Sequence, residues 1–168
     1  MVAAFVADPV FTHLFGAHYP EQAAVFAGAL FDLRVDLGTI WLVERGASLA
    51  MWSPPAPGGH TGVLGALEVP ARTAERLAEY DHAVESLLPT SEHWYLGVLA
   101  THPASAGKGW GRVAMAQGLA SASKDGLPAY LETASDVNVG IYQRVGWKVA
   151  ATARVGPLHV RVMSNPGS

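Results

Sequence analysis

The pattern of apolar and polar positions divides the chain into helical and extended segments. Apolar residues recur at intervals of three to four, which predicts helices at residues 23–35, 70–88, 112–124 and 137–145. Shorter runs that are apolar or alternating predict strands at residues 39–43, 48–52, 95–100, 129–133, 147–153 and 159–163. The pattern therefore predicts a protein that mixes helices and strands along its whole length.

The first half of the chain contains the clearest interruptions of this pattern. Residues 1–15 carry a helical stripe of apolar residues that Asp8-Pro9 interrupts, and residues 54–60 (PPAPGGH) form the strongest break. The inner side of the helix at 70–88 is expected to carry Ala71, Ala74, Leu77, Tyr80 and Leu87. No internal repeat or linker divides the sequence, so residues 1–168 are expected to form a single domain.

Composition narrows the class of protein. Half of the 168 residues are apolar, which excludes a disordered chain, and the formal net charge of −3 gives no basic footprint for nucleic acid. The absence of cysteine excludes disulfides, thiol nucleophiles and thiolate metal sites. No apolar run is long enough to cross a bilayer, and the N-terminus lacks the basic region of a signal peptide. We therefore expect a cytoplasmic protein with neither nucleic-acid nor membrane partners.

A glycine-rich turn follows the most apolar predicted strand. After residues 95–100 and a short turn, glycine occupies positions 107, 109 and 111, and the helix at 112–124 begins directly afterwards. A strand, a glycine loop and a helix N-terminus in this order direct bare backbone N–H groups and the positive end of a helix dipole at one place. Glycine permits both the positive φ angles of such a loop and the close approach of a ligand. The segment predicts a phosphate site.

Two nucleotide-binding loops share these features but differ in spacing. A P-loop has serine or threonine after Gly-Lys, whereas Lys108 is followed here by Gly109. The dinucleotide fingerprint has two residues between its second and third glycines, whereas Trp110 stands alone. Glu132 does lie near the position of the acidic residue that binds ribose in that fold. The spacing excludes a P-loop and weakens the dinucleotide interpretation without removing it.

The segment from Trp94 to Gly111 resembles motif A of the GNAT acetyltransferase superfamily, whose loop, Gln/Arg-x-x-Gly-x-Gly/Ala, holds the pyrophosphate of acetyl-CoA. Ala106 departs from this pattern at the Gln/Arg position. Further on, Leu131-Glu132-Thr133 and the run from Asn138 to Trp147 resemble motif B, an Asn followed by Tyr-x-x-x-Gly-Phe, with tryptophan replacing phenylalanine. Within the superfamily the sequence is most similar to the puromycin N-acetyltransferase-like branch.

The resemblance implies an α/β (α+β) fold of the GNAT type: a mixed, mostly antiparallel twisted sheet, helices on both faces and a splayed central strand. It also implies an acetyl-CoA:amine N-acetyltransferase that uses acetyl-CoA as co-substrate and no metal, and leaves open a homodimer. The acceptor would be a small-molecule amine, for example an aminonucleoside antibiotic. The family begins with a strand, whereas this chain starts inside the following helix, so the first strand is expected to be missing.

The cofactor-binding residues implied by the resemblance lie in both motifs. The backbone of Leu99, Ala100 and Thr101 is expected to pair with the pantetheine arm, and one of its N–H groups to polarise the thioester carbonyl. Asn138 is a candidate ligand of the pantetheine amides, with helix capping as its alternative role. The residues expected to hold the pyrophosphate are Gly107, Lys108, Gly109, Trp110, Gly111 and Arg112.

Tyr142 and Glu132 are the candidate catalytic residues. A phenol of pKa ~10 can protonate a departing thiolate, although a tyrosine at helical spacing also packs on cores. Glu132 is the best candidate to take a proton from the acceptor ammonium, with a structural sheet-end carboxylate as the alternative, and His93 and His102 are further candidates. Without cysteine, direct attack in a ternary complex is expected. The histidines show no metal-ligand spacing.

Two other classes of function stay open at this point. A nucleotide-dependent oxidoreductase would use the three glycines together with Glu132. A catalytically silent CoA-binding module would explain Ala106 and the missing first strand.

Overall fold

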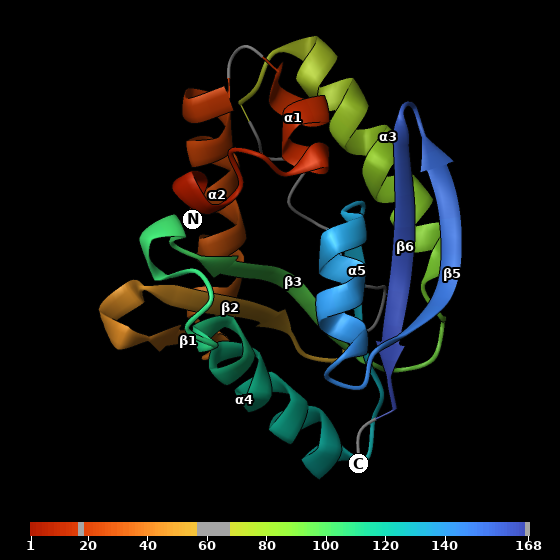
Figure 1. The fold of residues 1–168 in the computed structure, drawn as a ribbon. Helices are drawn as coiled ribbons and strands as arrows, with labels where there is room; N and C mark the ends of the chain where they lie inside the picture. The colour runs from red at the N-terminus through yellow and green to blue at the C-terminus, as the bar shows by residue number, and fades with distance from the viewer. Residues whose placement is uncertain (17–18, 57–67, 167–168) are drawn as a thin grey trace.

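The computed structural model describes residues 1–16, 19–56 and 68–166, coloured along the chain in Figure 1. The elements in chain order are η1 (Val2–Ala4), α1 (Pro9–Phe15), α2 (Tyr19–Val35), β1 (Ile40–Val43), η3 (Glu44–Gly46), β2 (Ser48–Ser53), α3 (Ala71–Leu87), β3 (Trp94–Thr101), η5 (Pro103–Ser105), α4 (Trp110–Asp125), β4 (Ala129–Thr133), α5 (Asp136–Gln143), β5 (Lys148–Val155) and β6 (Leu158–Asn165). Every predicted strand and helix is present, with ends that differ by a few residues. Residues 57–60 of the predicted break lie outside the described part.

The strands form one mixed sheet in the order β1-β2-β3-β4-β6-β5. All neighbours are antiparallel except β3 and β4, which run parallel. The mostly antiparallel α+β fold expected from the sequence is therefore confirmed. None of the helices in the described ranges is long and apolar enough to cross a bilayer.

Helices cover both faces of this sheet (Figure 1). On one face, Met115 of α4 and Tyr142 of α5 pack with Trp52 and Trp147 in a single core cluster. On the other face, Leu30 of α2 packs on Met51, Val98 and Ala100. A third cluster on that face joins α1, α2 and α3 to β5 and β6. The sheet thus separates α4 and α5 from α1, α2 and α3.

A bulge in β3 at Gly97 shapes the centre of the sheet. Val98 pairs with Met51 of β2, but Leu96 pairs with Trp52, so Gly97 is the extra residue. A Cβ at Gly97 would lie 2.7 Å from Nη2 of Arg34. The bulge reverses the alternation of side chains, and the parallel pairing with β4 covers Trp94 and Tyr95 only. Beyond this point β3 and β4 separate, as the predicted splay required.

The N-terminal residues form helices rather than a strand. Asp8 caps α1, with its Oδ1 accepting hydrogen bonds from the backbone N–H groups of Val10 (2.9 Å) and Phe11 (3.2 Å). The described residues 1–16 contain η1 and α1 and no strand.

The predicted inner side of the helix at residues 70–88 is wrong at two positions. On α3, Ala71 and Ala74 are exposed, and the buried residues are Thr73, Leu77 and Val84. Thr73 is buried because its hydroxyl donates to Oε1 of Gln22 at 2.7 Å, which satisfies both polar groups inside the protein.

Candidate active site

The glycine loop adopts the conformation that its sequence predicts. Gly107 and Gly109 have φ angles of 77° and 79°, in the left-handed region that favours glycine. Gly111 serves a different purpose, because a Cβ there would lie 3.1 Å from Oγ1 of Thr101 and would push α4 away from β3. Gly109 is the N-cap of α4, whose first turn carries no acidic side chain. No acidic side chain in the first turn therefore offsets the positive end of the α4 dipole, which faces the loop.

A cleft with a volume of about 570 Å³ opens over this loop. Its walls come from the N-terminal segment, the end of β3, the loop with the start of α4, and α5. Most of the predicted cofactor residues line it: Leu99, Thr101, Gly107, Gly109, Trp110, Gly111, Arg112 and Asn138. Lys108 is exposed on the loop outside the lining, and the Ala100 side chain is buried on the opposite face of β3. Both of these residues can contribute to the cleft only through backbone groups or a side-chain movement.

Helix α5 brings two predicted site residues to the wall of this cleft. Ser135, rather than the neighbouring Asp136, caps the helix by accepting a hydrogen bond from the backbone N–H of Asn138 at 3.3 Å. Asn138 therefore does not cap α5, and its side chain lies along the cleft. Tyr142, one turn later, is 9% exposed and packs on Trp147 with ring centroids 6.2 Å apart. The tyrosine thus combines a core position with access to the cleft.

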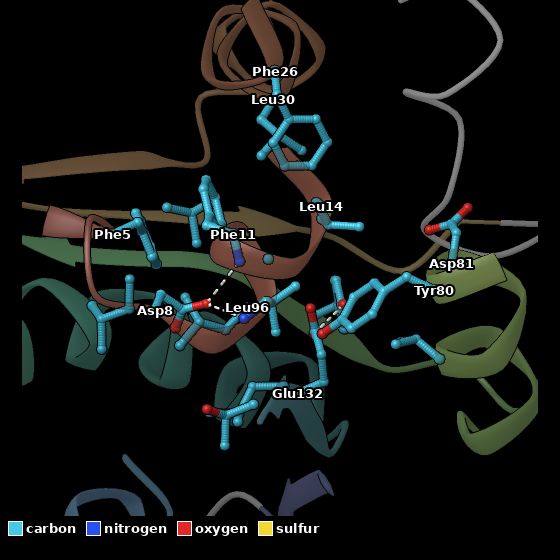
Figure 2. A pocket seen from close by; sticks show the side chains of 18 of the residues that line it. Phe5, Asp8, Phe11, Leu14, Phe26, Leu30, Tyr80, Asp81, Leu96 and Glu132 are labelled. Atoms are coloured by element: carbon cyan, nitrogen blue, oxygen red, sulfur yellow. Dashed lines mark hydrogen bonds between the residues drawn. The ribbon is translucent and has the colours of Figure 1, made fainter. Parts of the chain in front are cut away.

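A second cavity of about 140 Å³ meets the cleft from the other face of the sheet. Figure 2 shows its residues: Phe5, Phe11, Phe26 and Leu30 form apolar walls, and Asp8, Asp81 and Glu132 bring carboxylates. The cavity and the cleft share five lining residues, which we call the junction: Phe5, Asp8, Leu99, Asn138 and Tyr142. The gap between β3 and β4 explains this connection, because Leu99 and Leu131 belong to one face of the sheet while Tyr80 and Glu132 belong to the other.

Glu132 lies in this second cavity, where the Tyr95 hydroxyl donates a hydrogen bond to its Oε2. Burial raises the pKa of Glu132 to about 7, although the bond from Tyr95 opposes the shift. The carboxyl can therefore exchange a proton near neutral pH. Glu132 does not line the cleft over the glycine loop, so it is not placed to bind the ribose of a dinucleotide held there.

Asp8 and Arg34, two further charged groups of the second cavity, were not among the candidate residues of the sequence. Arg34 of α2 is 3% exposed, and its Nη1 donates to the Leu30 carbonyl at 3.0 Å. Burial lowers the pKa of Arg34 and raises that of Asp81 to about 6. Tyr142 stays protonated over the whole physiological range, because burial and the charges of Glu132 and Asp8 raise its pKa. A side chain that remains protonated can act as a proton donor.

The two candidate histidines lie outside both cavities. His93 is buried, with its Nδ1 2.7 Å from the Ser91 carbonyl and its ring against Tyr130. His102 is exposed, and its Nδ1 accepts the backbone N–H of Ala104 at 3.2 Å, which caps η5. Among the residues that the structure describes, no cluster of three or more potential ligands could hold a metal ion.

Comparison with known proteins agrees with this architecture. Residues 58–147, more than half of the chain, match the acetyltransferase (GNAT) family. The chain belongs to this family. The structure of a histone acetyltransferase HPA2 and related acetyltransferase from Corynebacterium glutamicum aligns over 99% of this chain and 87% of its own, with 23% identity and a TM-score of 0.64.

Two mosquito structures show the same fold at lower identity. The putative arylalkylamine N-acetyltransferase 7 of Aedes aegypti gives a TM-score of 0.70 at 12% identity, over 98% of this chain and 79% of its own. Arylalkylamine N-acetyltransferase 2 of the same species gives 0.64 at 11% identity, over 98% and 89%. These similarities confirm the GNAT fold, and the assignment to a puromycin-like branch remains a prediction.

Proposed function

We propose that this protein transfers the acetyl group of acetyl-CoA to a primary amine of a small molecule by direct attack in a ternary complex. The observation that carries the proposal is the junction, where a cleft over the glycine loop meets a second cavity beside Tyr142. A bisubstrate reaction needs two ligands that meet at one reacting centre. The opening between β3 and β4 lets them approach that centre from opposite faces of the sheet.

The cleft offers acetyl-CoA mainly backbone groups. The N–H groups of residues 107–112 and the start of α4 would bind the pyrophosphate. The pantetheine arm would lie along residues 99–101, where β3 has separated from β4 and its edge can accept an added strand. Asn138 would bond the amides of the arm. With the arm bound in this way, the thioester would lie at the end of the cleft where Tyr142 is found.

The chemistry requires the acceptor nitrogen to lose two protons and the departing thiolate to gain one. Glu132 would take a proton from the acceptor ammonium, directly or through a water, and the neutral amine would attack the thioester carbonyl. A backbone N–H of residues 99–101 would stabilise the oxyanion that forms. As the carbon–sulfur bond breaks, the Tyr142 hydroxyl would protonate the CoA thiolate. The Tyr142 phenolate would then take the second proton from the nitrogen, so the products are the amide, CoA and one proton that Glu132 releases to solvent.

The class of acceptor is supported by similar proteins and by the sequence resemblance rather than by contacts in the structure. Arylalkylamine N-acetyltransferases occur among the solved proteins that share this fold. The sequence resemblance to the puromycin N-acetyltransferase-like branch points to an aminonucleoside instead. Both acceptors are small molecules with a primary amine, which is the class that we propose.

Two measurements test the proposal. Calorimetric titration with acetyl-CoA should show saturable binding, and a thiol-release assay over a panel of primary amines should show turnover. Binding without turnover of any amine would instead identify a silent CoA-binding module. Preferential binding of NAD(P)H would support an oxidoreductase.

Replacing Tyr142 tests the assignment of the acid. Tyr142→Phe should lower kcat by about 100- to 10,000-fold, the usual contribution of a positioned acid, while the Kd for acetyl-CoA stays within about twofold. The matched control is Tyr130→Phe, which removes a hydroxyl from β4 at a residue that lines neither cavity. An unchanged rate for Tyr142→Phe would remove the acid role from this residue.

A further inference from the structure

The second cavity has the dimensions of one ring. Its volume of about 140 Å³ is close to the ~150 Å³ of an engineered apolar cavity that binds benzene. An aminonucleoside is several times larger than this space. The cavity therefore favours an acceptor with a single ring-sized group.

Aromatic side chains line the part of this cavity formed by α1 and α2. The Phe5 and Phe11 rings stack with centroids 4.4 Å apart, and Phe26 meets Phe11 edge to face at 5.9 Å (Figure 2). Such a wall offers both ring faces and ring edges to a guest, and aromatic pairs prefer offset or edge-to-face contacts. A planar apolar ring fits this wall better than a flexible polar chain.

Carboxylates outnumber cations around the same space. Asp8, Asp81 and Glu132 line it, whereas Arg34 is its single cationic side chain among the described residues. Arg34 is already engaged with the Leu30 carbonyl and packs over the bulge at Gly97. The cavity is therefore suited to a cationic ligand and disfavours a ligand that carries a carboxylate.

Asp8 is the one acidic residue at the junction itself. Both of its N-cap hydrogen bonds end on Oδ1, so Oδ2 can accept a bond from a ligand. The charge of Asp8 also acts on Tyr142, the proposed acid. Capping alone would not need this charge, because asparagine and serine cap helices equally well.

We propose that the acceptor is a primary amine with one ring-sized apolar group and no carboxylate, whose ring packs on Phe5, Phe11 and Phe26 in the second cavity and whose ammonium lies between Asp8, which binds it, and Glu132, which takes its proton. This inference rests on the proposed function and names its substrate class. It makes Asp8 a specificity-determining residue and the N-terminal segment an acceptor-binding element. Neither role is contained in the sequence motifs.

A set of four amines tests the ring and the charge. We expect kcat/KM for 2-phenylethylamine to exceed that for ethylamine by about 10- to 100-fold, the range that burial of one ring supplies. Phenylalanine, which has the same ring and adds a carboxylate on the carbon that bears the amine, should be at least about tenfold poorer than 2-phenylethylamine, as expected for an unpaired charge. Puromycin should be a poor acceptor. Equal kcat/KM values for ethylamine and 2-phenylethylamine would overturn the inference. A higher kcat/KM for phenylalanine or puromycin than for 2-phenylethylamine would also overturn it.

The variant Asp8→Asn tests the ammonium contact. Asparagine keeps the N-cap and removes the charge, so thermal stability should stay the same while KM for 2-phenylethylamine rises by about tenfold or more. The Kd for acetyl-CoA should not change. The matched control is Asp32→Asn, an exposed position on α2 that lines neither cavity. Equal KM values for Asp8→Asn and wild type would overturn the role of Asp8.

A binding experiment separates this inference from the proposed function. Calorimetry of 2-phenylethylamine with the CoA-loaded protein should show binding that Asp8→Asn weakens by about tenfold and that ethylamine does not match. If this binding occurs but no amine is acetylated, the proposed transfer fails and the assignment of the cavity stands. If amines are acetylated but 2-phenylethylamine binds no better than ethylamine, the inference fails and the transfer stands.

Discussion

The two cavities that meet at Tyr142 are built in different ways. The proposed phosphate and pantetheine contacts of the cleft over the glycine loop are backbone groups of one continuous segment, from the end of β3 to the start of α4, and the N-terminal segment and α5 complete its walls. The second cavity is lined by residues from the N-terminal segment, α1, α2, α3, β3, β4 and α5, which are far apart in sequence. The cleft can bind any ligand with the diphosphate and pantetheine arm of CoA, whereas the ligand that fits the second cavity depends on the identity of each side chain.

This difference separates a shared function from a specific one. Backbone groups tolerate substitution, so a family can keep one cleft for a common co-substrate. Side chains that converge from several helices can change individually, and each change alters the shape or charge of the cavity. We therefore expect substitutions in the cleft to act on acetyl-CoA and those in the second cavity to act on the amine.

The largest effect is expected from a bulky residue in the glycine loop. Gly109→Val places a β-branched side chain at φ 79° and projects it toward the phosphate position. Loss of two charge-assisted hydrogen bonds would weaken acetyl-CoA binding by at least ~100-fold, which calorimetry measures.

A control at the other end of α4 distinguishes backbone strain from ligand loss. Gly126 has φ 68° and terminates the helix away from both cavities. Gly126→Val should lower stability to a similar extent while acetyl-CoA affinity stays unchanged. Retained affinity in Gly109→Val would place the phosphate elsewhere and break the comparison between the two cavities.

A smaller effect, confined to the amine side, is expected for Glu132→Gln. The rate of the wild type should rise with pH through about 7, because Glu132 must lose its proton to act as a base. The variant should be slower by about 100-fold and should lack this rise. Its Kd for acetyl-CoA should match that of the wild type.

The same variant should be more stable than the wild type at neutral pH. The pKa of Glu132 is raised in the folded state from 4.5 to about 7, so the folded protein binds the proton more tightly than the unfolded chain does. Stability linked to this group is full below pH 4.5 and falls as the pH rises to about 7. Glutamine removes that loss, and the gain of Glu132→Gln should be about 1–3 kcal/mol at pH 8 and smaller at pH 5. If the variant and the wild type have equal free energies of unfolding at both pH values, burial does not raise the pKa of Glu132.

The sequence predicts the backbone-built region better than the side-chain-built one. Apolar periodicity places every strand and helix, and glycine spacing locates the loop, because both depend on residues close in sequence. The predicted inner face of α3 was partly wrong because Thr73 is buried through its hydrogen bond to Gln22. A pattern of apolar residues cannot reveal a polar pair that is buried together.

The second cavity has no comparable local signal. Asp8 caps α1, Arg34 lies on α2 and Tyr80 lies on α3, and all three line the cavity beside the bulge at Gly97, where β3 and β4 separate. The apolar pattern shows Asp8-Pro9 only as an interruption of a helical stripe, whereas in the structure Asp8 is the N-cap of α1. Glu132 was found because it lies in a motif, whereas its hydrogen-bond partner Tyr95 lies on a different strand.

The smallest effect is expected at His102, which lies next to the glycine loop but outside both cavities. Its imidazole caps a short 3₁₀ helix and is exposed, so His102→Ala should cost about 0.5 kcal/mol of stability, at the low end for a lost cap. Because the loop holds its ligand through backbone groups, kcat/KM should stay within about twofold at all pH values. A tenfold loss together with a flattened pH profile would instead make His102 the base. The proton would then be accepted on the cleft side of the junction, and Glu132 would be left with a structural role in the second cavity.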